Sequence, residues 1–315
     1  MAIAVGASMS FVTLITSDDF LMAVQALASS LKATRTAHLP LLVLYTDQVS
    51  ANTVSRLEAD ASVAVSEAAI WAQRLTLASH MAICCLAGAA WGGVWWSKVS
   101  TSSESGKGMS ITLHSAVPSP GERLKPFPTR IALTCVSAFH VFLSRPGWVN
   151  SGFTKLRIWE QDDFAKLVYI DADCLVLDNI DDLFGRPCPA FAPDVFPPDK
   201  FNAGVIVLEP SKVVFQEMIM QCEKLPSHDG GDTGFLNSFY PDWFSWPAEQ
   251  RLPFRYNALR TMYWFTHANP GYWQSLMPLK VLHFCSSPKP WDAEAKKGDL
   301  EQIWWEHYLK SQMPF

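Results

Sequence analysis

The sequence predicts an α/β fold with a mostly parallel central sheet, and two observations carry this prediction. The first is an alternation of strand-like and helix-like segments over the first 66 residues. The second is a set of charged or polar side chains placed directly after apolar, strand-like runs. With 315 residues, 49% hydrophobic and 17% charged, the chain is long enough to bury a core of this kind.

The N-terminal part alternates regularly between short apolar runs and amphipathic segments. Because parallel neighbours in a sheet need a crossover between them, this order is typical of a parallel sheet. We expect strands at 11–16, 39–45 and 62–66, and helices at 20–32 and from about Ser50.

Regular patterns return after residue 147. The segment 147–159 has Phe153, Leu156 and Trp159 on one helical face, with Lys155 to one side. Downstream we expect a strand that ends at Asp171, a strand at 201–210 entered through a tight Asn-Ala-Gly turn, a helix capped by Ser211 and ending near 225, a glycine-rich turn at 229–237, and a strand at 279–284.

The segment from about 67 to 144 does not follow the alternation. It contains 23 residues without Asp, Glu, Lys or Arg (75–97), followed by the polar run 100–108. By length the apolar run matches a membrane span, but it includes His80, is rich in Gly and Trp, and would interrupt the sheet. We therefore expect one domain over 1–315, interrupted by an insertion at about 67–144 that is either a surface excursion or translated non-coding sequence.

Charge and cysteine content exclude several classes of protein. The net charge is −5 and the basic residues are scattered, so we expect no nucleic-acid partner. The seven cysteines show no CxxC spacing, and the first ten residues are too short for a secretory signal. We expect a cytoplasmic protein without membrane contact as the chain stands, or one of the secretory pathway if the true N-terminus lies upstream.

The run Val-Tyr-Ile-Asp-Ala-Asp ends a strand-like segment in two carboxylates, Asp171 and Asp173. Side chains at i and i+2 of an extended segment point to the same side, so the pair is able to converge on one cation. Carboxylates placed together resist ionisation unless a cation neutralises them. An isolated Asp-x-Asp pair is common by chance, so other residues must supply support.

Two later residues supply it. His283 ends an apolar strand, and because the carboxyl ends of the strands gather at one edge of an open parallel sheet, we expect it to meet the aspartates there. One imidazole among carboxylates shifts the preference from magnesium towards manganese. Six residues further on, Lys289 stands between two prolines and is a point charge suited to a phosphate. A metal and a lysine together predict a diphosphate site.

Four motifs, in this order, resemble glycosyltransferase family 8, in particular glycogenin and its plant relatives. They are YIDADCLVLDNIDDLF, FNAGVIVLEPS, DGGDTGFLN and HFCSSPKPW, and GWVNSGFTKLRIW is closest to the plant type. The resemblance covers about 11–65 and 147–291. It implies a GT-A, Rossmann-like fold and retaining transfer of a glucosyl or glucuronosyl unit from a UDP-sugar to a carbohydrate, protein or lipid-linked acceptor. It leaves a homodimer open.

By motif position the resemblance assigns roles to individual residues. Asp171, Asp173 and His283 would bind Mn²⁺, and Lys289 would hold the diphosphate. Asp232, Asp229 and Lys155 would form the catalytic face, where Asp232 either stabilises positive charge at the anomeric carbon or acts as nucleophile. The remaining donor-binding residues would be Leu14, Thr16, Ser17, Ala172, Asn202, Ala203 and Thr233.

Departures from glycogenin concern the sugar and the acceptor. Ser17, Phe20 and Thr233 replace an asparagine, a tyrosine and a glutamine of glycogenin. The tyrosine that glycogenin glucosylates on itself falls at Trp264, with Tyr263 one place earlier, so a separate acceptor is favoured.

Two alternatives remain open at this point. Asp-Ala-Asp-Cys-Leu-Val also resembles the strand end of haloacid-dehalogenase-type phosphatases, but their later Gly-Asp-x-x-x-Asp has a leucine at its last position here, Leu236. The other alternative is a non-catalytic family member that the 67–144 insertion prevents from folding or from closing over a donor.

Overall fold

The computed structural model describes residues 8–38, 40–66, 96–104, 107–115, 152–195, 199–222, 224–268, 271–295 and 298–313. The chain forms two compact units, Met1–Ala69 together with Pro146–Phe315, and Ile70–Arg145. Within the second unit the described residues form two antiparallel strands, β4 (Trp96–Glu104) and β5 (Lys107–Ser115). The apolar run 75–97 lies outside the described residues except for its last two positions. Among the helices that are described, none is both long and apolar enough to cross a membrane.

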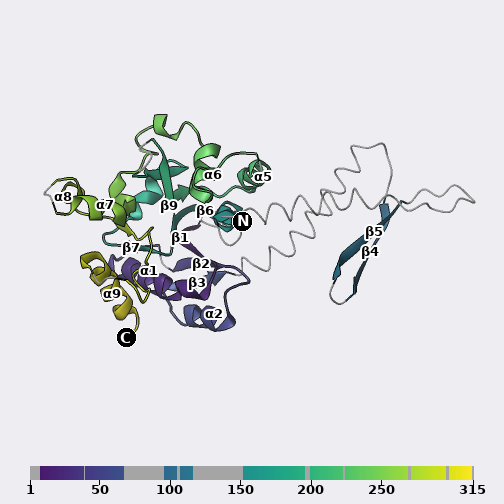
Figure 1. The fold of residues 1–315 in the computed structure, drawn as a ribbon, viewed down its shortest axis with the longest axis horizontal. Coiled ribbons are helices and arrows are strands. Elements are labelled where there is room, and N and C mark those ends of the chain that lie inside the picture. The colour runs from purple at the N-terminus through teal and green to yellow at the C-terminus, as the bar shows by residue number, and fades with distance from the viewer. Residues whose placement is uncertain are drawn as a thin grey trace, which may run out of the picture. The chain divides into compact units, whose positions relative to one another are not determined.

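The first unit is built on a six-stranded sheet with the order β3-β2-β1-β6-β9-β8 (Figure 1). Its strands are β1 (Ser8–Ile15), β2 (Leu41–Tyr45), β3 (Val63–Ser66), β6 (Phe164–Ile170), β8 (Ala190–Pro193) and β9 (Phe201–Leu208). The first four strands in this order are parallel, while β9 is antiparallel to both of its neighbours. The predicted mostly parallel α/β fold is confirmed.

A second sheet of three strands carries the late strand of the sequence. Its order is β10-β11-β7, with β7 (Cys174–Val176), β10 (Ala258–Leu259) and β11 (Val281–His283). β11 runs antiparallel to β7, with His283 opposite Cys174. We expected His283 to reach the acidic pair at the edge of one parallel sheet. The two meet instead because β11 pairs with the strand that directly follows Asp173.

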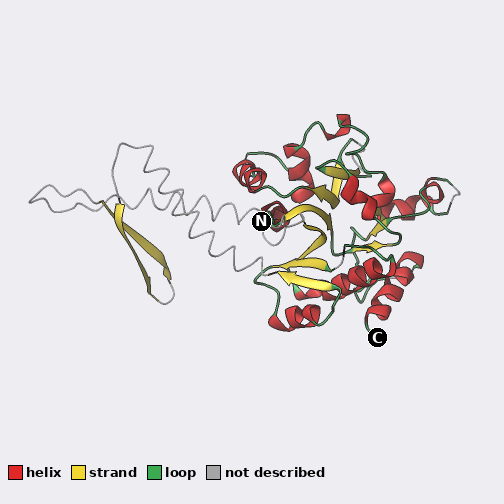
Figure 2. Ribbon diagram, turned by 180° about the vertical axis from the view of Figure 1, so that it is seen from behind, coloured by secondary structure: helices red, strands yellow, loops and turns green. Residues whose placement is uncertain are grey.

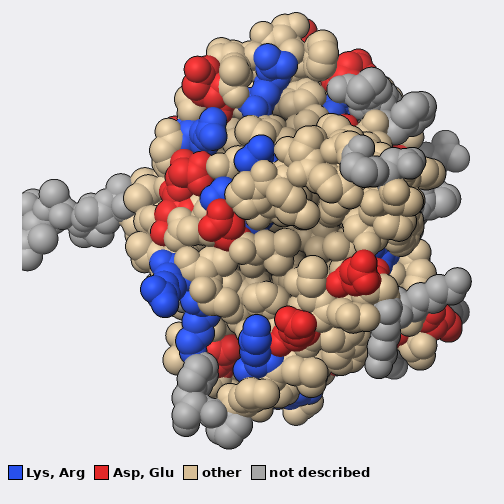
Figure 3. All heavy atoms as spheres, turned by 90° about the vertical axis from the view of Figure 1, so that its left-hand side faces the viewer, with Lys and Arg blue, Asp and Glu red and all other residues tan. Residues whose placement is uncertain are grey.

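Helices lie on both faces of the six-stranded sheet (Figure 2). The described helices of this unit are α1 (Leu21–Ala33), α2 (Ala51–Glu58), α5 (Lys212–Gln221), α6 (Asp232–Phe239), α7 (Arg260–Thr266), α8 (Tyr272–Ser275) and α9 (Asp299–Ser311). Ser50 and Ser211 cap α2 and α5, each accepting a hydrogen bond from the backbone N–H three residues on, as their positions predict. α1 and α9 pack side by side beneath the second sheet. On the face seen in Figure 3, acidic and basic side chains are interspersed with uncharged surface.

The core explains why these segments fold as they do. Strands β1, β2, β6 and β9 are almost continuously apolar because helices or neighbouring elements cover both of their faces. Buried aliphatic side chains of α1, such as Val24, Leu27 and Leu31, share one cluster with Phe11 and Val168 of the sheet. This packing fixes the strand ends at which the candidate residues lie.

Two local predictions need correction, and a third gains detail. The segment Gly152–Glu160 is helical as expected, in the 3-10 form in which residues three apart eclipse, so Leu156 and Trp159 share a buried face; Lys155 lies off this face and is buried as well. Asn202-Ala-Gly is part of β9 and not a turn. The predicted turn at 229–237 ends early, since α6 begins at Asp232.

We propose that the segment 67–144 is an insertion into one catalytic domain. Replacing it with a flexible Gly/Ser linker should leave the thermal unfolding midpoint and UDP affinity of the remaining domain at least as high, because loop-closure cost rises slowly with loop length. Calorimetry on both proteins measures this. A shortened chain that is unfolded beside a folded full-length protein would show that the segment belongs to the core.

Candidate active site

The two aspartates of the acidic motif lie on a turn between β6 and β7. The Asp171 N–H donates to the carbonyl of Gly204 on β9, and the Cys174 N–H donates back to the Asp171 carbonyl. The extended geometry expected for Asp-Ala-Asp is therefore wrong, since a four-residue turn replaces it. Their charges nonetheless gather at one place: His283 Nε2 lies 3.3 Å from Asp173 Oδ1 and 3.8 Å from Asp171 Oδ2.

Two lysines neutralise the carboxylates. Lys155 Nζ lies 2.9 Å from Asp171 Oδ1 and 2.5 Å from Asp232 Oδ2, and it also donates to the carbonyl of Ala203. Lys289 Nζ lies 2.6 Å from Asp173 Oδ2. The side chain of Lys155 is only 10% exposed and that of Asp173 only 11%, so these pairs are largely shielded from water. Unpaired charges would be costly at this depth.

The protonation preferences follow from this pairing. Burial opposes the charge on Lys155, but Asp171 and Asp232 outweigh it and raise the pKa of the ammonium. Burial likewise works against the Asp173 carboxylate, and His283 and Lys289 overcome it, so the pKa of Asp173 is lowered. Asp232 differs: its burial, which Lys155 offsets only in part, raises the pKa of this carboxyl.

A chain of hydrogen bonds fixes the orientation of His283. The backbone N–H of Gly204 can only donate, so the atom of Asn202 that it contacts at 2.9 Å must be the amide oxygen. The same oxygen accepts from Asn257 Nδ2 at 2.8 Å. Asn257 therefore turns its own oxygen to His283 Nδ1, also at 2.8 Å. His283 Nδ1 therefore carries a proton and donates to this oxygen, which leaves Nε2 as the ring atom that faces the two aspartates.

Asp232 and Asp229 take different positions. Asp232 is the first residue of α6, where a negative charge is favourable, and its carboxylate contacts Lys155. Asp229 Oδ1 accepts from Ser227 Oγ and from the N–H groups of Gly231 and Gly234. Asp229 thus shapes the turn into α6 in this structure, and its predicted contact with a sugar stays a prediction.

The other predicted donor-binding residues divide into two groups. Asn202, Ala203 and Thr233 adjoin the charged groups: the Ala203 carbonyl accepts from Lys155, Thr233 Oγ1 accepts from the Ala203 N–H, and Asn202 accepts from Asn257, the partner of His283. Leu14, Thr16 and Ser17 lie at and just beyond the end of β1. This stretch leads to Phe20, whose ring lies 5.7 Å from the ring of Trp291, and Trp291 follows Lys289 by two residues.

Three residues of the site were not predicted from the sequence. Tyr169 donates to Asp171 Oδ1 at 2.6 Å, and Asn257 orients His283. Gly204 admits the imidazole, because a Cβ there would lie 2.4 Å from His283 Cε1. A glycine inside a strand often marks such a close approach, which was the available signal for Gly204. For Tyr169 the signal was its position two residues before Asp171, which puts both side chains on the same side of a strand. No sequence signal pointed to Asn257.

The oxygen and nitrogen atoms of this site are suitable ligands for a divalent cation. Asp173, Cys174 and His283 each place a ligand atom within 4.8 Å of the others. Cys174 is a poor ligand, because burial and the neighbouring Asp173 raise the pKa of its thiol well above the usual range and a metal binds the thiolate. Asp171 is the better third ligand on these grounds.

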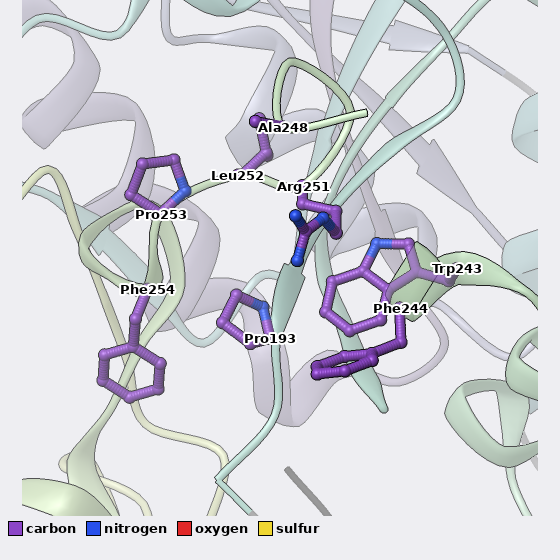
Figure 4. Close-up of a pocket in the computed structure, with 8 residues that line it drawn as sticks. All are labelled: Pro193, Trp243, Phe244, Ala248, Arg251, Leu252, Pro253 and Phe254. Atoms are coloured by element: carbon purple, nitrogen blue, oxygen red, sulfur yellow. The ribbon is translucent and has the colours of Figure 1, made fainter. Parts of the chain in front are cut away.

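One pocket of about 270 Å³ among the described residues lies apart from these charges (Figure 4). Its walls are apolar and aromatic except for Arg251, whose guanidinium points into the space between Pro193 and Phe244. None of the predicted site residues lines it. The pocket adjoins the site at Pro193, which pairs with Phe201 in the sheet and precedes Asp194, the acceptor of Asn202.

Known proteins resemble this chain in sequence over about half of its length. Glycogenin-1 of Caenorhabditis elegans is 39% identical over 158 residues, which cover 50% of this chain and 36% of the relative. Human glycogenin-1 is 37% identical over 192 residues (56% and 54%). Inositol phosphorylceramide glucuronosyltransferase 1 of Arabidopsis thaliana is 35% identical over 176 residues (50% and 30%). No family model matches, and the chain spans between 30% and 54% of the length of these relatives.

Solved structures share the fold. The galactosyltransferase LgtC, in complex with donor and acceptor sugar analogues, superposes with a TM-score of 0.56 at 16% identity, over 97% of each chain. The glycosyltransferase GlyE of Streptococcus pneumoniae TIGR4 gives a TM-score of 0.55 at 16% identity, over 96% of this chain and 60% of its own. The architecture is the GT-A fold of these proteins.

Substitution of Gly204 by alanine should disturb the site directly, because the new methyl group meets the buried His283 ring and the Asn202 oxygen. We expect a loss of about 1–3 kcal/mol in the free energy of unfolding, together with weaker binding of divalent cations. Chemical denaturation and metal titration measure the two effects. Gly185→Ala is the control, since nothing lies within 4 Å of its Cβ. Equal behaviour of the two variants would contradict the close-approach role of Gly204.

Proposed function

Because the chain belongs to the glycogenin-like glycosyltransferases of family 8, we propose that it transfers a hexosyl unit from a UDP-sugar to an acceptor. The transfer retains the anomeric configuration and requires Mn²⁺. The observation that carries the proposal is the gathering of Asp171, Asp173, His283 and Lys289 at one place, although more than 100 residues separate the aspartates from His283 and Lys289.

The three metal ligands would be Asp171, Asp173 and His283. Two carboxylates and one imidazole form a mixed oxygen and nitrogen set, which suits manganese better than magnesium. His283 already turns its Nε2 towards the carboxylates, and the Nε2 lone pair of a neutral imidazole would bind the cation. When bound, the cation supplies a Lewis acid that stabilises the negative charge of the leaving diphosphate.

Lys289 would provide the second positive charge for that diphosphate. Without a ligand its ammonium contacts Asp173 and the carbonyl of Phe284. A divalent cation bound at Asp173 would take over the neutralisation of this carboxylate. Lys289 is then available to a phosphate oxygen, with which a charged hydrogen bond is strong.

The reacting face lies on the other side of Asp171. Asp232 is buried beside Lys155 at the start of α6, and its carboxylate would face the positive charge that develops on the sugar. It would either stabilise that charge or act as nucleophile. Lys155, Asn202 and Asp229 would contact the donor. In this structure Lys155 binds Asp171, Asp232 and Ala203, so it also serves as the counter-ion that these two carboxylates share.

The sugar would be a glucosyl or glucuronosyl unit and the acceptor a separate carbohydrate, protein or lipid-linked molecule. The position of Tyr263 supports a separate acceptor, since its hydroxyl donates to Asp299 and its ring stacks on His267. Trp264, which follows it, has no hydroxyl to glycosylate.

The phosphatase alternative finds less support in the site. Leu236, which stands where that family needs an acid, is fully buried in α6. A side chain without oxygen at this depth has no means to bind the cation that phosphatase chemistry requires. Hydrolysis of phosphomonoesters in place of UDP-sugars would revive this alternative.

Replacing either aspartate by asparagine should lower Mn²⁺-dependent UDP-sugar turnover by at least about 100-fold, because each substitution removes a ligand charge. Product analysis of UDP release measures this, with circular dichroism to confirm folding. Asp178→Asn is a suitable control, since Asp178 pairs with Lys280 outside the site. Undiminished turnover in Asp171→Asn or Asp173→Asn would remove the metal-site proposal.

Lys289→Met should change two affinities in opposite directions. UDP should bind about 10-fold or more weakly in the presence of Mn²⁺, because a charged hydrogen bond is lost. In the absence of nucleotide, Mn²⁺ should bind more tightly, because the ammonium that competes for Asp173 is gone. Calorimetric titrations measure both values, and Lys280→Met is the control. A purely structural role of Lys289 predicts that both affinities fall.

A further inference from the structure

A buried arginine lies behind the loop that carries Lys289. Arg260, the first residue of α7, is only 1% exposed. A guanidinium at this depth requires partners for its donors, because an unpaired buried charge costs several kcal/mol. The partners of Arg260 therefore show what it does for the fold.

Most of its hydrogen bonds go to one short segment. Nη2 donates to the Ser286 carbonyl at 2.7 Å, to Ser286 Oγ at 2.8 Å and to the Pro288 carbonyl at 2.8 Å. Nε donates to Ser286 Oγ at 3.2 Å. The guanidinium thus joins the two backbone carbonyls at 286 and 288, immediately before Lys289.

The composition of this segment explains the need for an external donor. Pro288 and Pro290 have no N–H group, and the Lys289 N–H already donates to the Asp292 carboxylate. The loop is consequently rich in carbonyl acceptors and poor in donors. A guanidinium offers five donors in a fixed plane, which complements such a loop better than a lysine does.

The arginine is itself held in place. Nη1 lies 3.0 Å from Glu301 Oε1, a buried carboxylate in the first turn of α9. Its faces are covered by aromatic rings, with the Trp264 centroid at 4.8 Å and that of Phe284 at 5.4 Å. Glu301 and these rings leave the guanidinium little freedom to move, so the position of the loop is tied to α9.

We propose that Arg260 is a positioning residue for the UDP diphosphate. It makes no contact with the donor itself; it clamps Ser286 and Pro288 so that Lys289 is presented to the phosphates, and Glu301 of α9 anchors the clamp. The inference rests on the proposed function, because it assigns Arg260 a role through the diphosphate lysine. Small displacements of such a group are costly, since a shift of about 1 Å can slow a reaction about 100-fold.

The first experiment separates positioning from stability. Arg260→Met leaves Glu301 buried without a partner, so we expect a lower unfolding midpoint and a UDP dissociation constant raised about 10-fold or more. The double variant Arg260→Leu/Glu301→Leu removes both charges and should recover most of the midpoint without recovering UDP affinity. Recovery of both would show that Arg260 only stabilises the fold. Arg251→Met is the matched control, as that arginine lies in the pocket of Figure 4.

A second experiment asks whether Arg260 acts through Lys289. In a Lys289→Met background the clamp has no lysine to position, so the Arg260→Leu/Glu301→Leu change should weaken UDP binding no further. Additive losses would overturn the proposal. Mn²⁺ affinity without nucleotide should not fall when only the clamp is removed, whereas damage to the metal site would lower it.

Failure of the clamp and failure of the proposed function give different results. A wild-type chain that binds neither UDP nor Mn²⁺ contradicts the proposed function. A wild-type chain that binds UDP, with equal affinity in the folded clamp variants, contradicts the clamp alone.

Discussion

The structure of this site depends on the cost of keeping three carboxylates close together with limited access to water. Asp171, Asp173 and Asp232 face two ammonium groups and one imidazole. Burial alone would raise the pKa of both Asp173 and Asp232, and His283 and Lys289 reverse this effect at Asp173. Each partner comes from a different element: Lys155 from the 3-10 helix before β6, His283 from β11 and Lys289 from the following loop. The charges thus determine which distant parts of the chain must come together.

This pairing has a consequence for ligand binding. In the proposed function, a divalent cation and a diphosphate carry charges of opposite sign, as the lysines and aspartates do, so their binding would exchange partners rather than create new buried charge. Lys289 would be the residue that changes its partner, because that partner, Asp173, is a proposed metal ligand. Lys155 would keep its three oxygen partners around a buried ammonium.

Positioning is the task of neutral and remote groups. The N–H of Gly204 fixes the amide orientation of Asn202, and Asn202 fixes that of Asn257. Asn257 in turn fixes Nδ1 of His283 as a hydrogen-bond donor. Arg260 transmits the position of α9 to the lysine loop. Both devices use donors whose orientation has no alternative, namely a backbone amide and a planar guanidinium. Because such groups have a fixed orientation, they hold the neighbouring side chains in one position, and a reaction depends on such precise positioning.

The sequence by itself determined the strand and helix alternation, the caps Ser50 and Ser211, and the identity of the acidic pair, His283 and Lys289, because periodicity and strand-end position are local properties. Only the tertiary structure decided how these residues meet. The antiparallel pairing of β11 with β7, the burial of Lys155 between two aspartates and the roles of Asn257 and Arg260 depend on contacts between segments far apart in the chain. Local sequence patterns do not encode such contacts, because an asparagine or arginine on an exposed surface can have the same neighbouring residues in sequence.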